Sequence, residues 1–153
     1  MIKNNYKISY PSSKKVYIEG KLHNIKVAMR EISLTDTVVL KDGVKIFVPN
    51  APIIVYDTSG PYSDDNQNVD IKKGIARMRK DWIENRADSE RLPRFTSPYS
   101  RQNKQNATLN FPIINLPRRA KAGKKITQMA YAKAGIITPE MEYASIRENM
   151  QNE

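Results

Sequence analysis

The chain has 153 residues with a formal net charge of +10 and a mean hydropathy of −0.64, which fits a single domain with long polar connections or one docked on a larger body. It has no cysteine and one histidine, which excludes disulfides, thiolate-held iron–sulfur clusters and a local zinc site of His and Cys. No apolar run approaches the roughly 20 residues of a membrane span, and the N-terminus lacks a secretion pattern, so we expect a cytoplasmic protein.

The basic residues are spread along the chain except for one run, Arg118–Lys125. Phosphate neutralisation is the usual reason for such a charge, but neither aromatic-interleaved RNA-binding motifs nor zinc-finger spacing accompanies it. We therefore favour a solvated surface, or one facing an acidic partner domain. The alternative is a stand-alone basic nucleic-acid-binding module, which would need this run to form one basic face.

The N-terminal third carries β-branched and alternating patterns that predict strands. Strands are predicted at residues 14–19, 25–30, 37–40, 44–48 and 53–56. Lys41-Asp42-Gly43 separates two β-branched runs, which predicts a hairpin. Ile53–Tyr56 is continuously apolar and is the predicted most buried strand. Together these spacings predict an antiparallel meander.

The stretch Asp57–Pro61 (Asp-Thr-Ser-Gly-Pro) ends the last of these strands with residues that bond their own backbone. We interpret it as a structural turn, with a domain-contact loop as the second interpretation. A third interpretation, a small hydrolase with Ser59 as nucleophile, would need His23 and a carboxylate to converge on it. The sequence instead favours His23 as an ordinary turn residue.

Apolar residues then recur at helical spacing, at Ile71, Ile75, Met78 and Trp82. We interpret this stripe as the core face of a helix that covers the sheet, beginning after Gly74 if the glycine interrupts it. Residues 86–116 are punctuated by prolines and are rich in Asn and Gln from 101 to 110. They predict a long, partly mobile loop.

The last stretch predicts a helix that ends at Gly135 and a second that begins at Thr138-Pro139. Glu140 and Glu142 lie in the first turn of the second helix, near the positive end of its dipole. Its apolar stripe is thin, so we expect this helix to leave the domain as an arm and to dock elsewhere.

The run Gly135–Asn149 (Gly-Ile-Ile-Thr-Pro-Glu-Met-Glu-Tyr-Ala-Ser-Ile-Arg-Glu-Asn) resembles the segment leading into the catalytic barrel of the phosphomethylpyrimidine synthase family, radical S-adenosylmethionine enzymes of thiamine biosynthesis. Other stretches match the same family in the same order. They are Lys15–Tyr17, Met29–Ser33, Val55–Tyr62, Asp70–Ile75, Trp82–Glu84 and Pro117–Lys121. The resemblance thus covers most of the chain, with little match from 101 to 115.

The predicted fold class is α+β: a small, mostly antiparallel sheet covered by one or two helices, with a C-terminal helical arm. The resemblance implies that residues 1–134 form an N-terminal accessory domain and that 135–153 lead into a catalytic barrel. The family converts aminoimidazole ribotide to hydroxymethylpyrimidine phosphate with a [4Fe–4S] cluster, S-adenosylmethionine and zinc. Its cluster cysteines, zinc histidines and substrate residues belong to later parts of the enzyme.

The resemblance therefore assigns no catalytic, cofactor-binding or metal-binding residue to this chain. By itself the chain is expected to be inactive and to have a structural role. The implied partners are the enzyme's own barrel and a second copy in a homodimer, with neither nucleic acid nor membrane among them.

Overall fold

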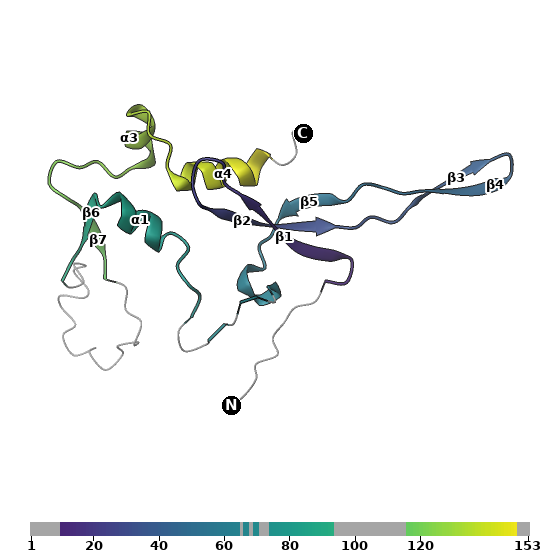
Figure 1. The fold of residues 1–153 in the computed structure, drawn as a ribbon, viewed down its shortest axis with the longest axis horizontal. Coiled ribbons are helices and arrows are strands. Elements are labelled where there is room, and N and C mark those ends of the chain that lie inside the picture. Colours follow the sequence, from purple (N-terminus) through teal and green to yellow (C-terminus); the bar gives the residue numbers. More distant parts are fainter. Residues whose placement is uncertain (1–9, 65, 68, 71–73, 94–115, 150–153) are drawn as a thin grey trace, which may run out of the picture. The chain divides into compact units, whose positions relative to one another are not determined.

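The computed structural model describes residues 10–64, 66–67, 69–70, 74–93 and 116–149 (Figure 1). The described elements are short antiparallel sheets and a few helices, which confirms the predicted α+β class. They form two compact units, one of residues before 72 together with the last helix, the other between 72 and 138. No helix in these described ranges has the length and apolar content needed to cross a bilayer.

The first unit is built on a three-stranded antiparallel sheet. Its strands are β1 (Ser13–Glu19), β2 (Lys26–Ile32) and β5 (Ile53–Tyr56), in the order β1-β2-β5. The core is in the central strand, where Val27 and Met29 have no exposed surface. The prediction that Ile53–Tyr56 is the most buried strand is therefore wrong, because among the described strands of this sheet β5 lies at an edge and β2 has neighbours on both sides.

Between β2 and β5 the chain forms a separate hairpin of β3 (Thr37–Lys41) and β4 (Val44–Val48). Asp42 and Gly43 both have positive φ, at 52° and 78°, as a tight hairpin turn requires, and the predicted hairpin is confirmed. The predicted continuous meander is wrong, because β5 pairs directly with β2 and the hairpin stands outside that sheet (Figure 1).

The last helix, α4 (Pro139–Asn149), begins at the predicted proline. The expectation that it leaves the domain as an arm is wrong, because α4 contacts β2 of the first unit. Tyr143 meets Tyr56 edge to face with ring centroids 6.4 Å apart, and Arg147 lies over the Tyr56 ring. Aromatic and polar contacts thus hold the helix where the apolar stripe looked too thin.

In the second unit, α1 (Lys80–Arg86) starts later than the apolar stripe predicted. Gly74 has a left-handed φ of 71°, and Ile75 and Met78 lie before the helix with 58% and 51% of their surface exposed. The predicted core stripe is therefore wrong at these two positions. Ile71 lies outside the described residues. Within the first unit the helix that contacts the sheet is α4, and within the second unit α1 contacts β6.

The segment predicted as a long loop, residues 86–116, contains a strand near its start. This strand, β6 (Ser89–Arg91), pairs antiparallel with β7 (Arg118–Ala120), which follows the predicted loop, so the loop prediction is wrong at β6. The Asn/Gln-rich part from 101 to 110 lies outside the described residues. Helix α3 (Gln128–Lys133) follows, with Thr127 accepting a hydrogen bond from the Ala130 amide as its N-cap. Gly135, at φ 71°, ends it as predicted.

Candidate functional site

The first of two polar clusters in the first unit surrounds the loop that follows β5. The Asp57 carboxylate is 2% exposed and lies 2.8 Å from Arg30 Nη2 and 3.5 Å from Lys15 Nζ. Arg30 belongs to β2 and Lys15 to β1, and β2 pairs with both β1 and β5 (Figure 1). The Arg30 and Lys15 side chains are also buried, at 12% and 7% exposed, so the three charges form an internal ion cluster.

Serines complete this cluster and fix the turn. Asp57 Oδ1 accepts the Ser59 amide at 2.7 Å, a side-chain-closed turn, and a 3-10 helix, η1 (Gly60–Ser63), follows. Arg30 Nη2 donates to Ser63 Oγ at 2.7 Å and to Ser59 Oγ at 3.4 Å. These contacts confirm the predicted structural turn. Arg30 Nη1 also donates to Ser13 Oγ at 3.1 Å, and Lys15 Nζ donates to the Gly60 carbonyl.

The Asp57 carboxyl stays ionised despite its burial. Burial by itself raises its pKa, but hydrogen bonds from the Ser59 side chain and amide, and the charges of Lys15 and Arg30, outweigh that effect and hold the pKa below its ordinary value. Removing Asp57 would leave the buried cations of Lys15 and Arg30 without their shared carboxylate. The arrangement is therefore suited to holding three strands and a loop in one geometry.

The hydrolase interpretation of Ser59 is not supported by this geometry. Within the described residues no hydrogen bond joins Ser59 to His23, whose ring instead contacts Glu142. The Ser59 hydroxyl contacts Asp57, Arg30 and the Ser63 hydroxyl. A serine without a histidine base, next to a carboxylate that is already neutralised, is poorly placed for nucleophilic attack.

A tyrosine extends the cluster along β1. The Tyr17 hydroxyl donates to Asp64, which is 6% exposed. Burial, together with the hydrogen bond and the charge of Asp64, raises the pKa of Tyr17 to about 12. Tyr17 thus remains protonated at neutral pH and acts as a fixed donor that attaches the end of η1 to β1.

The second cluster attaches α4 to the turn between β1 and β2. Glu142, 7% exposed, accepts the Leu22 amide at 2.7 Å, the His23 amide at 2.9 Å and His23 Nδ1 at 2.7 Å. Gly20 makes this approach possible, since a Cβ there would lie 3.1 Å from the Glu142 carboxyl carbon. The turn therefore presents a pair of backbone N–H groups to one helical carboxylate.

Burial tends to raise the Glu142 pKa, but the hydrogen bonds from the Leu22 amide and from His23 lower it more, so the pKa lies below its ordinary value. His23 is confirmed as a turn residue, and it also contributes to this anchor. The sequence analysis placed Glu142 only at a helix dipole, and nothing in the local pattern indicated a partner about 120 residues away.

The basic run 118–125 does not form one uncompensated basic face. Arg119 Nε bonds Glu90 at 2.6 Å, and Arg118 bonds Ser89 and lies 3.9 Å from Glu84. The remaining lysines of the run follow β7 in a turn around Gly123. Neighbouring glutamates thus neutralise part of the positive charge that a nucleic-acid-binding face would need.

The described residues also contain no candidate metal-binding site. In the ranges that the structure describes, no three His, Asp or Glu side chains converge in a way that could hold a metal ion. The two clusters are therefore positioning sites: one fixes the Asp57–Pro61 loop and the other fixes α4.

The family model of the ThiC-associated domain matches residues 9–90, more than half of the chain. The matched range contains the whole three-stranded sheet, the β3–β4 hairpin, the Asp57–Pro61 loop and α1.

Proposed function

The chain belongs to the ThiC-associated domain family, the N-terminal domain of ThiC (phosphomethylpyrimidine synthase), and from this we propose that it acts as the accessory domain of that enzyme. In this role it contributes to thiamine biosynthesis by shaping and assembling the enzyme. The reaction itself, from aminoimidazole ribotide to hydroxymethylpyrimidine phosphate, is assigned by this proposal to a catalytic barrel of the same enzyme.

The observation that carries the proposal is the use of buried ionisable groups. Asp57, Asp64 and Glu142 are the buried carboxylates among the described residues, and each accepts several hydrogen bonds from strands, turns or loops of the same unit. Catalytic groups are instead expected in a cleft with an unsatisfied or strongly poised proton site. These buried hydrogen bonds and ion pairs are best suited to a structural role, in which the domain acts as a rigid scaffold.

The cofactors that the family resemblance implies do not fit this chain. A [4Fe–4S] cluster needs thiolates, and the chain has no cysteine. Among the described residues no His and carboxylate group is suited to zinc either. The proposal therefore places the cluster, S-adenosylmethionine and zinc on the catalytic part of the enzyme, which acts in the cytoplasm as a homodimer.

The proposal is tested with two measurements on the purified chain. After incubation with iron and sulfide, the cluster absorbance band should be absent, and stoichiometric iron uptake would refute the assignment. When mixed with the catalytic polypeptide of a phosphomethylpyrimidine synthase, the chain should bind it in a defined ratio by size-exclusion chromatography with light scattering. A chain that binds DNA or RNA with steep salt dependence, and not that polypeptide, would favour the nucleic-acid alternative.

A further inference from the structure

The β3–β4 hairpin is the largest feature of the first unit that the two clusters leave unexplained. All ten of its strand residues are exposed, and Figure 1 shows it extending beyond β5 and the rest of the sheet. In the described part of the chain no third strand pairs with either of its edges. A lone two-stranded hairpin is at best marginally stable in water, so this one calls for a partner.

Both faces of the hairpin are apolar, which is unusual for a hairpin exposed to solvent. The register places Val38 opposite Phe47 on one face, hereafter face A, and Val39 opposite Ile46 on the other, face B. These four side chains are 42–63% exposed. Leu40 also lies on face A and is 70% exposed. A hairpin adapted to water alternates apolar and polar residues instead, and contiguous exposed apolar surface marks an interaction site.

The hairpin is held in shape without the partner. Its turn, Asp42-Gly43, has the positive φ values that favour the twist of a tight hairpin. At its base, Asn50 Nδ2 donates to the Thr35 carbonyl at 2.6 Å and to Thr37 Oγ1 at 3.0 Å. A preformed element loses less conformational entropy on binding, so this hairpin is suited to bind as a rigid element.

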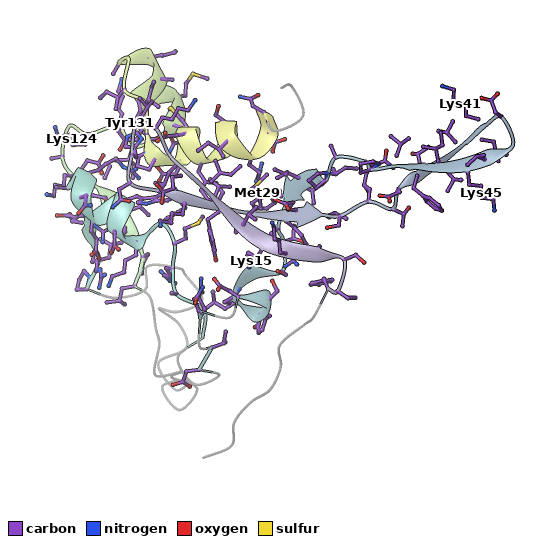
Figure 2. The ribbon with its side chains drawn as sticks, turned by 45° about the vertical axis from the view of Figure 1, so that its right-hand side comes forward. Lys15, Met29, Lys41, Lys45, Lys124 and Tyr131 are labelled. Carbon is purple, nitrogen blue, oxygen red and sulfur yellow. The ribbon has the colours of Figure 1, made fainter. Side chains whose placement is uncertain are left out.

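The turn end of the hairpin carries one lysine on each face. Figure 2 shows Lys41 and Lys45 near the turn, and the register places Lys45 on face A with Leu40 and Lys41 on face B with Val44. A partner that covers the apolar part of both faces would therefore bring acidic groups to its innermost end. Asp42, at the turn itself, offsets only one of the two positive charges.

From these observations, and on the basis of the proposed function, we infer that the β3–β4 hairpin inserts into an apolar cleft of the enzyme's catalytic domain. The cleft has apolar walls against faces A and B and acidic residues near Lys41 and Lys45. A two-fold pairing with a second copy of the hairpin fits less well. It would cover one face of each hairpin, with three or four apolar side chains, whereas a standard interface uses about 20–30 residues a side.

The test compares variants of the two faces with a control of the same chemistry. The face A variant carries Val38→Lys with Phe47→Lys, and the face B variant carries Val39→Lys with Ile46→Lys. The control is Ile75→Lys with Met78→Lys, since both residues are more than half exposed, lie outside the hairpin and belong to neither cluster. Calorimetric titration of the 153-residue chain with the catalytic polypeptide gives the affinity of each. Equal thermal midpoints for all four proteins show that the substitutions leave the fold intact.

Each face variant is expected to weaken binding at least tenfold, and the control to remain within twofold of the parent chain. Loss of binding from one face alone would overturn insertion into a cleft. Equal binding by all variants would overturn the hairpin's role while leaving the proposed function standing. If the parent chain does not bind the catalytic polypeptide at all, both the proposed function and the insertion of the hairpin into the catalytic domain are wrong.

Two further measurements separate the remaining outcomes. Sedimentation of the chain alone should give a monomer, and a dimer that either face variant dissolves would assign the hairpin to a second copy and contradict the inference. If a face variant unfolds, hydrogen exchange of the parent chain decides instead. Amides of Val38–Leu40 and Val44–Phe47 should exchange at least tenfold more slowly with the catalytic polypeptide present, and unchanged exchange would refute insertion.

Discussion

The carboxylate of Glu142 is predicted to be the main attachment of α4, and its replacement by glutamine isolates that role. Glutamine keeps the shape but provides one acceptor oxygen instead of two, and its amide nitrogen would face a backbone N–H. Glu142 accepts two backbone amides and the His23 ring at 2.7–2.9 Å while 7% exposed. Hydrogen bonds to a charged group contribute about 1.5–3 kcal/mol each, and an unsatisfied buried donor costs about 1–3 kcal/mol.

From these values, Glu142→Gln should lower the free energy of unfolding by about 2–4 kcal/mol, measured by urea titration. The loss should depend on pH. The folded-state pKa of Glu142 lies below its ordinary value, so its stabilisation is complete above the unfolded pKa and is lost as pH falls through the folded pKa. The difference between parent and variant should therefore be constant above about pH 5 and shrink below about pH 4.

The matched control is Glu148→Gln, which removes the same charge from the same helix. Glu148 is 66% exposed and forms a surface ion pair with the neighbouring Arg147, so its loss should change stability by less than about 0.5 kcal/mol. Hydrogen exchange in α4 should rise in the Glu142 variant and stay unchanged in the control. Equal unfolding curves and equal α4 protection for Glu142→Gln and the parent would refute the anchor.

Three further substitutions test the core, the turn and the ion cluster. Met29→Ala should cost about 2–5 kcal/mol in urea unfolding, because Met29 is completely buried in the central strand; a loss below 1 kcal/mol would contradict that placement. Gly20→Ala should lower the thermal midpoint, because its Cβ would lie 2.6 Å from both the His23 carbonyl oxygen and Ile25 Cγ1, and an unchanged midpoint would show that the turn adapts freely. Asp57→Asn should cost about 3–5 kcal/mol near neutral pH by leaving two buried cations uncompensated. Since the Asp57 pKa is lowered in the fold, that cost should diminish in acid below its ordinary range, and a cost independent of pH from 3 to 7 would contradict the assignment.

Local chemistry was predictable from the sequence wherever the determinants are adjacent along the chain. The Asp42-Gly43 turn, the helix end at Gly135 and the helix start at Pro139 all follow from backbone preferences of one or two residues. The Asp57–Pro61 turn follows in the same way, since its closing bond spans two residues. The α+β class could be predicted because the strand patterns lie together in residues 14–56 and the helical patterns follow them, so the two are segregated along the chain.

Strand order and the helix that covers the sheet could not be read from these patterns. A continuous apolar run such as Ile53–Tyr56 fits a central or an edge strand equally, and the order is decided by long-range pairing with β2. The stripe at Ile75 and Met78 has helical spacing, but the left-handed Gly74 precedes a helix that forms only from Lys80. The predicted boundary between residues 134 and 135 concerns the longer enzyme and stays a prediction.

The two clusters were also out of reach of the sequence, because their members are far apart in it. Arg30 and Asp57 are 27 residues apart, and Glu142 lies 119 residues from His23. A charged residue within a strand, followed by an Asp directly after the next paired strand, is the signal that could have indicated the ion cluster. For Glu142, the pattern of the helix start carries no signal of a partner in the distant turn.

The most direct test of the account measures formation of hydroxymethylpyrimidine phosphate by three preparations after identical iron and sulfide reconstitution. They are the 153-residue chain, the catalytic polypeptide of a phosphomethylpyrimidine synthase, and an equimolar mixture of the two. If the chain is an accessory domain, we expect no product from the chain alone and at least tenfold more product from the mixture than from the catalytic polypeptide alone. Product from the chain alone, or a catalytic polypeptide that neither binds the chain nor gains activity from it, would contradict an accessory role.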